Sequence, residues 1–247
     1  MPDLGVLGWA ALAVAALVIG MSKTALPGAG TVAVALFAAV LPAKQSTGTI
    51  LLLLILADVF AVVAYRRHAD FRALLRLAPA VIVGMLAGIA FLAVSDDHLV
   101  RIVIAGILLL VIAITLLRRH MRRVVEGEGS HRVAAGVYGT LGGFTTMVAN
   151  AAGPVMSMYF LAARFSVKEF LGTAAWFFAI VNVAKVPFLV GLGMITPTGL
   201  LIDAVLAPLV IVSALAGRWV ASRIDQAVFE RLVIALTVAG AIYLLVA

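Results

Sequence analysis

The chain has 247 residues, of which 65% are hydrophobic and only 12% are charged. A soluble domain of this size could not keep so much apolar surface away from water, so the composition excludes an ordinary soluble protein and predicts an all-α polytopic membrane protein. The formal net charge of +7 does not point to a nucleic-acid partner, because the arginines lie in the loops between apolar runs. Cysteine is absent, which excludes disulfides and thiolate metal sites, and we expect neither a metal nor a cofactor.

The first apolar segment, residues 5–41, is interrupted near its middle. The stretch "GMSKTALPGAG" at 20–30 places a lysine, a proline and several glycines between two uncharged runs. Irregular backbone at membrane depth is tolerated only where protein buries it or water bathes it. We therefore predict a re-entrant helical hairpin whose short second limb begins near Gly30-Thr31.

Three full membrane spans follow, at about 48–66, 74–94 and 99–118, and complete a first repeat over residues 1–124. Arginines gather after the first and the third of these spans, and loops rich in Lys and Arg lie on the cytoplasmic side. Residues 1–4 and 42–47 are then outside, so the segment 5–41 begins and ends on the outer side. It cannot cross the bilayer once, which is a second reason to predict a hairpin.

The second interrupted segment, residues 133–163, begins and ends on the cytoplasmic side by the same rule. Its limbs, Val133 to Leu141 and Pro154 to Ala163, have about ten residues each, or roughly 15 Å at 1.5 Å per residue. That is half of a ~30 Å hydrocarbon core, so we predict that the segment turns near mid-depth and returns. Spans at about 168–190, 198–219 and 227–246 follow. They complete a second repeat over residues 125–247 and leave both termini on the outer side.

The two halves of the chain match one another in order along their length. A repeat with one hairpin and three spans has an odd number of crossings, so the second copy must have the opposite orientation. Inverted repeats with discontinuous helices are a recurrent design of secondary transporters, with the substrate site at the midplane between them. The alternative is that the halves share only an apolar composition. The matched pairs include Gly20 with Gly143, Gly48 with Gly172, Asp58 with Asn182, and Pro79 with Pro208.

The interruptions predict an anion site where the two hairpins meet. The N-terminus of a helix carries positive partial charge and free N–H groups, and both second limbs would point these ends toward the centre. Glycines let a ligand approach the backbone, hydroxyl and amide side chains add neutral donors, and Lys23 adds a full positive charge. The candidate substrate-binding residues are Ser22, Lys23, Thr24, Gly30, Thr31, Thr145, Thr146, Asn150, Gly153, Asn182 and Lys185.

Three ionisable residues, Lys23, Asp58 and Lys185, are expected deep in the membrane, where each costs about 2.5–3.5 kcal/mol on insertion scales. One hypothesis is that the lysines contact the anion while Asp58 balances charge or carries a coupling proton. Asn182 lies one helical turn before Lys185 and shares its face. The alternatives are that Lys23 and Asp58 form a structural ion pair, and that Lys185 extends to the outer interface.

At "GMSKTALPGAGTVAVALFAAVLP" and "GTLGGFTTMVANAAGPVMSMYFLA" the sequence resembles the sulfite exporter TauE/SafE family, also called the TSUP permeases. The resemblance covers nearly the whole chain. It implies a multi-pass permease of the bacterial inner membrane that moves sulfite, organosulfonates or related sulfur anions, usually outward. The partners that it implies are a small anionic substrate and the lipid bilayer.

The sequence thus favours a secondary exporter of small sulfur-containing anions that works by alternating access. The rival in another transport class is a cation or metal-ion permease that uses Asp58 and the carbonyls of the hairpins. A third alternative is a membrane enzyme or assembly factor, but the sequence shows no nucleophile–base arrangement, so we expect no enzyme. Association of copies into a homo-oligomer stays open.

Overall fold

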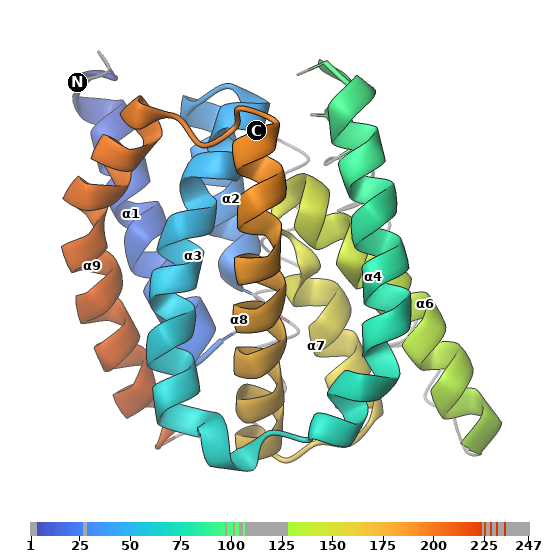
Figure 1. Cartoon of the computed structure of the whole chain (residues 1–247). Coiled ribbons are helices and arrows are strands. Elements are labelled where there is room, and N and C mark those ends of the chain that lie inside the picture. Colours follow the sequence, from blue (N-terminus) through green and yellow to red (C-terminus); the bar gives the residue numbers. More distant parts are fainter. Residues whose placement is uncertain are drawn as a thin grey trace.

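The computed structural model describes residues 4–26, 29–96, 98–100 and 128–223, together with single positions at 102, 103, 106, 225, 228, 231 and 235. Within these residues the regular structure is helical throughout (Figure 1). The α-helices are α1 (Gly5–Thr24), α2 (Gly30–Val40), α3 (Ala43–Tyr65), α4 (Phe71–Val94), α6 (Glu128–Ala149), α7 (Ala152–Ala162), α8 (Val167–Gly191) and α9 (Pro197–Ala221), and a 3₁₀ turn, η2 (Arg66–His68), follows α3.

Five of the described helices are long and apolar enough to cross a membrane: α1, α3 with η2, α4, α8 and α9. Shorter apolar helices cover Gly30–Val40, Val133–Ala149 and Ala152–Ala162. The prediction of an all-helical polytopic membrane protein is therefore confirmed. The predicted spans near 48–66, 74–94, 168–190 and 198–219 correspond to α3, α4, α8 and α9. The predicted spans at 99–118 and 227–246 lie outside the described residues, apart from a few single positions.

Each interrupted segment consists of one long helix and one short helix. In the first segment, α1 has 20 residues and α2 has 11. In the second, α6 has 22 residues and α7 has 11. The expectation that the first limb of the second segment ends at Leu141 was wrong, because α6 continues without a break to Ala149.

Close packing explains why the glycine-rich part of α6 stays helical. Glycine disfavours a helix interior by about 1 kcal/mol relative to alanine. However, a Cβ on Gly143 would lie only 2.2 Å from the carbonyl oxygen of Val81 on α4, and one on Gly139 would lie 2.8 Å from the Ala80 Cβ. Small residues at such an interface let two membrane helices approach backbone to backbone, and the packing offsets the poor helix propensity.

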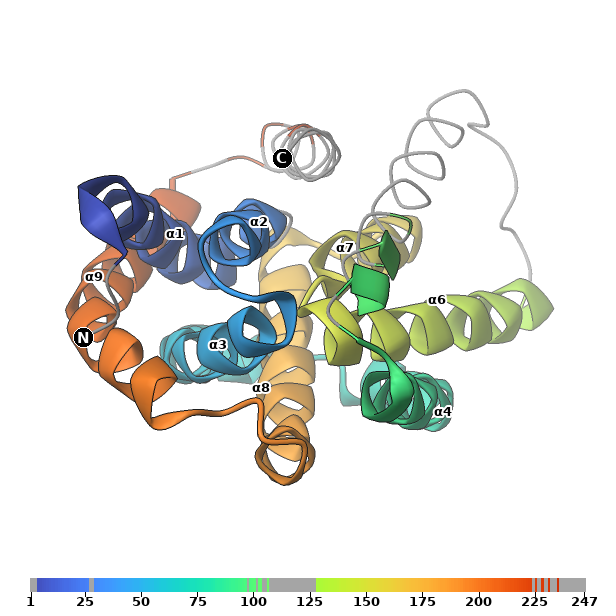
Figure 2. The same ribbon diagram turned by 90° about the horizontal axis from the view of Figure 1, so that it is seen from above.

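The same kind of contact joins α1 to α9. A Cβ on Gly20 would lie 2.3 Å from the carbonyl oxygen of Val210, and a Cβ on Gly217 would lie 2.2 Å from Thr24 Oγ1. Seen from above, α1 and α9 lie side by side on one flank and α4 and α6 on the other, with the remaining described helices between them (Figure 2). The central helices α2, α3, α7 and α8 bring the two helix breaks together.

The outer surface of the helices is apolar. On α4, Leu75, Ile82 and Leu86 are exposed, whereas Leu77 and Val81 on the opposite face are buried. A folded protein surrounded by water does not expose so many large apolar side chains on one helix face, but a lipid-facing helix does. This surface fits the lipid bilayer as the surroundings of the molecule.

Candidate functional site

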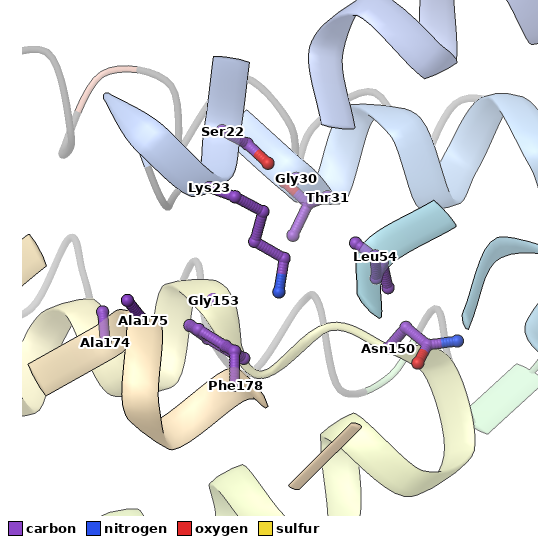
Figure 3. Close-up of a pocket in the computed structure, with 10 residues that line it drawn as sticks. All are labelled: Ser22, Lys23, Gly30, Thr31, Leu54, Asn150, Gly153, Ala174, Ala175 and Phe178. Carbon is purple, nitrogen blue, oxygen red and sulfur yellow. The ribbon is translucent and has the colours of Figure 1, made fainter. Parts of the chain in front are cut away.

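A pocket opens where the break between α1 and α2 faces the break between α6 and α7. Figure 3 shows Lys23 extending from the end of α1 into this space, with Leu54 and Asn150 on one side and Phe178 on the other. Among the described residues of the lining, Lys23 is the one that carries a charge. The described residues that line the pocket are Ser22, Lys23, Gly30, Thr31, Leu54, Asn150, Gly153, Ala174, Ala175 and Phe178.

The start of each short helix contributes to the pocket wall. Gly30 and Thr31 form the first turn of α2, and Gly153 is the second residue of α7. The first N–H groups of a helix have no partner within it, and they carry its positive partial charge. Two helix N-termini and one ammonium group therefore border the same space, which is a favourable environment for an anion.

Asn150 produces the sharp turn between α6 and α7. Its backbone has a φ of 52°, in the left-handed region, which asparagine tolerates better than most residues other than glycine. Its side-chain amide is held on both sides, because Oδ1 accepts a hydrogen bond from Lys185 and Nδ2 donates to the Thr47 carbonyl at 2.9 Å. Pro154 follows in the first turn of α7, where a missing N–H costs nothing.

Lys23 forms a buried ion pair with Asp58. Its Nζ lies 2.8 Å from Asp58 Oδ1, and the exposed fractions of the two side chains are 9% and 1%. The second carboxylate oxygen, Oδ2, accepts a 2.6 Å hydrogen bond from the Asn182 amide. The ammonium also lies over the Phe178 ring, 4.1 Å from its centroid. The structure thus contains the ion pair that was the structural alternative for these two residues, and places it at the pocket rather than away from it.

Lys185 has a different environment. Its Nζ donates to the Thr146 carbonyl at 2.9 Å, to Thr146 Oγ1 at 3.1 Å and to Asn150 Oδ1. Three acceptors match the three N–H donors of an ammonium, and a cation at the C-terminal turn of α6 is favoured by the helix dipole. Lys185 is fully buried, so it does not extend to the outer interface. It fixes the end of α6 and does not line the pocket.

The other predicted residues fall into two groups. Ser22, Gly30, Thr31, Asn150 and Gly153 line the pocket with Lys23, whereas Thr24, Thr145, Thr146 and Asn182 do not. The hydroxyls of Thr24 and Thr145 donate back to helix carbonyls, those of Gly20 and Gly142. This is the local bonding that Ser and Thr commonly adopt inside helices.

Four lining residues are not among the predicted ones: Leu54, Ala174, Ala175 and Phe178. A signal for them was present in the helical period. Leu54 lies one turn before Asp58 on α3, and Phe178 lies one turn before Asn182 on α8. Extending each polar position by one turn along its own face would have found Leu54 and Phe178, and a second turn along α8 leads to Ala174 and Ala175.

The comparison with protein families agrees with this architecture. The profile of the family described as "Sulfite exporter TauE/SafE" matches residues 12–244. The chain belongs to this family. As a TauE/SafE protein it is a multi-pass membrane transporter rather than an enzyme, so both the resemblance in its sequence and the transport class are confirmed. No curated protein and no solved structure matches the TauE/SafE chain described here.

Proposed function

We propose that this TauE/SafE transporter exports a small sulfur-containing anion, such as sulfite or an organosulfonate, across the bacterial inner membrane, and that both of its termini lie on the outer side. The observation that carries the proposal is the Lys23 ammonium, which enters a pocket between two helix N-termini. The other polar side chains among the described lining residues, those of Ser22, Thr31 and Asn150, are neutral donors and acceptors. A small anion suits this combination of a cation, two helix N-termini and neutral hydrogen-bonding groups.

In this proposal Asp58 is the counter-ion of Lys23 when no substrate is bound. An unpaired ammonium in a buried site is costly, so Lys23 needs an anionic partner whether or not substrate is present. Asp58 supplies it in the structure, with Asn182 holding its second oxygen. An incoming anion would compete with Asp58 for the Lys23 ammonium. After the anion is released, the ion pair between Lys23 and Asp58 would form again. Lys185 and Thr146 act indirectly, by holding Asn150 in place.

Alternating access between two inverted repeats is supported by contacts at matching positions. Gly20 approaches the backbone of α9, and its counterpart Gly143 approaches the backbone of α4. A Cβ on Gly48 would lie 2.0 Å from the Met194 carbonyl oxygen, in the connection after α8, and one on Gly172 would lie 2.8 Å from the Tyr65 carbonyl oxygen at the end of α3. In each case a residue of one half meets the corresponding element of the other half, as a pseudo-two-fold arrangement requires.

The direction of transport follows from the membrane potential. A cytoplasm that is negative inside drives an anion outward by about 2.3 kcal/mol per charge per 100 mV. Export of sulfite therefore needs no nucleotide-hydrolysing partner, and the chain can work by itself as a secondary transporter.

Flux into proteoliposomes tests the proposal. We expect sulfite uptake driven by a positive-inside potential in the wild type, loss of uptake in Lys23→Met, and unchanged uptake in Lys168→Met, which removes an exposed lysine. The double variant Lys23→Met/Asp58→Asn leaves no unpaired charge, so its loss of uptake cannot be blamed on a destabilised fold. Uptake that survives in a folded double variant would contradict the proposal.

The cation-permease alternative makes the opposite prediction. If Asp58 binds a transported cation, cation flux should survive Lys23→Met and disappear in Asp58→Asn. The contacts of Asp58 argue against this role, because one oxygen faces an ammonium at 2.8 Å and the other accepts from an amide at 2.6 Å. A cation would have to displace a lysine to reach it.

A further inference from the structure

A second buried carboxylate, Asp203 on α9, lies outside the pocket. Its side chain is 8% exposed, and within the described part of the chain neither of its oxygens has a hydrogen-bond partner. Asp58, in contrast, has a lysine at one carboxylate oxygen and an asparagine at the other. The two buried aspartates therefore differ in whether their charge is balanced by a partner. Nothing in the anion mechanism uses Asp203.

Asp203 belongs to the buried face of α9, together with Gly199, Ile202 and Leu206. Ile202 and Leu206 pack in the same apolar cluster as Leu12 of α1 and Ile50 of α3. The carboxylate is thus on the side of α9 that faces two neighbouring helices, not on the lipid side. It lies two turns from the start of α9 at Pro197.

A second polar group without a partner lies at the same contact. Thr49 on α3 is 1% exposed, and no described residue forms a hydrogen bond with its hydroxyl. A Cβ on Gly199, one turn before Asp203 on the same face, would lie 2.6 Å from Thr49 Oγ1. The contact between α3 and α9 therefore contains a carboxyl group and a hydroxyl group that are both buried and both unsatisfied.

The charge state of Asp203 follows from these surroundings. An ionised carboxylate buried without a partner is far more costly than a neutral carboxylic acid, so such a group keeps its proton instead. The titratable groups on the described helices packed against α9 are Lys23 on α1 and Lys44, Asp58 and Tyr65 on α3, with Arg218 on α9 itself. None of them is hydrogen-bonded to Asp203, so no described cation stabilises its charged form.

We propose that Asp203 is a proton-binding site that is protonated in this conformation and is separate from the anion pocket. Ionisation releases one proton to water, and it becomes favourable only when α9 separates from α3 and water reaches the carboxyl group. Binding and release of the proton would then follow the movement of α9. That the proton accompanies the anion rests on the proposed function, whereas proton binding itself does not.

Infrared spectroscopy of the purified full-length protein in liposomes tests proton binding without any substrate. We expect the carbonyl stretch of a protonated carboxylic acid at pH 7, its loss in Asp203→Asn, and its retention in the double variant Lys23→Met/Asp58→Asn. A wild-type spectrum without this signal at pH 7, or a signal that Asp203→Asn leaves unchanged, would overturn the proposal. Asparagine has nearly the same shape, so the fold should be preserved.

A pH series of thermal unfolding gives a second readout. In the unfolded chain an aspartate has a pKa near 3.9, so above that pH the folded protein would bind one more proton than the unfolded chain. The unfolding midpoint of the wild type should therefore fall relative to that of Asp203→Asn as the pH rises from about 5 to 8. Parallel curves would contradict a protonated Asp203.

Proteoliposomes separate this inference from the proposed function. With a pH gradient in place, sulfite flux through the wild type should respond to the gradient, and flux through Asp203→Asn should continue without that response. If the wild type moves no sulfite, the anion proposal fails, while the infrared signal still decides whether Asp203 binds a proton.

Discussion

Lys23 on α1 and Asp58 on α3 face each other at 2.8 Å beside a pocket, and the carboxylate of Asp58 is held from its other side by Asn182 on α8. Three helices from distant parts of the chain thus meet at a single ion pair. A pair that borders open space differs from one sealed in a core, because a ligand can reach it and take the place of one partner.

Asp58→Asn should strengthen anion binding and lower the stability of the protein when no anion is bound. Removing the carboxylate leaves Lys23 buried without a counter-charge, which costs about 3 kcal/mol when one partner of a buried pair is lost. A bound anion would restore the balance. We expect sulfite to raise the unfolding midpoint more in Asp58→Asn than in the wild type, with the exposed Asp96→Asn as a control. Weaker stabilisation by sulfite would show that Asp58 does not compete with the anion.

Phe178→Leu should reduce anion affinity while preserving the fold. The ring lies against the Lys23 ammonium, with 4.1 Å between Nζ and the ring centroid, and such a contact is worth about 1 kcal/mol in a partly desolvated site. Loss of the whole contact sets an upper limit of about a fivefold weaker apparent affinity for sulfite in transport assays. The variant also widens the pocket, so bulkier organosulfonates should lose less than sulfite does. An equal loss for both would mean that the ring does not shape selectivity.

Lys185→Met should destabilise the protein, because it removes all three hydrogen bonds of the lysine at the end of α6 and leaves their acceptors unsatisfied. The loss is expected to be on the order of 3 kcal/mol, measured as the free energy of unfolding in detergent. A double-mutant cycle with Thr146→Val provides the control. The two changes should be strongly non-additive, and simple additivity would show that the pair contributes little.

Gly143→Ala and Gly20→Ala should each lower stability by about 1–3 kcal/mol, because the added methyl group overlaps a carbonyl oxygen of the neighbouring helix. Gly136 offers the matched control on α6, since a Cβ there meets nothing within 4 Å. Gly136→Ala should be neutral or slightly stabilising, by the ordinary gain in helix propensity. The measurement is the unfolding midpoint of each purified variant.

The sequence predicted the start of the short helices better than the ends of the long ones. Gly30 begins α2, and α7 begins at Ala152, two residues before the predicted Pro154. The end of α6 could not be predicted from residues 139–146 alone, because glycine and threonine weigh against a helix unless a neighbour compensates. The compensating backbone of α4 lies far away in the sequence and becomes visible only in the fold.

The residues of the candidate site could likewise be predicted only in part from the sequence. Lys23 and Asp58 were recognisable because each is a charge inside an apolar run, where a charge requires a reason. The partner of Lys185 was not recognisable, because the spacing along α8 gives the face of the lysine but not the helix end that it meets. The burial of Asp203 could not be predicted either, because a position near the end of a span does not show which neighbouring helix covers it.

The close contacts at Gly20 and Gly217 pack α1 tightly against α9, and those at Gly84, Gly88 and Gly143 pack α4 tightly against α6. If the protein works by alternating access as proposed, each pair is expected to move as a unit. The shape change would then occur at the contacts between these pairs and the central helices, close to Lys23 in the last turn of α1 and to Asn150 between α6 and α7.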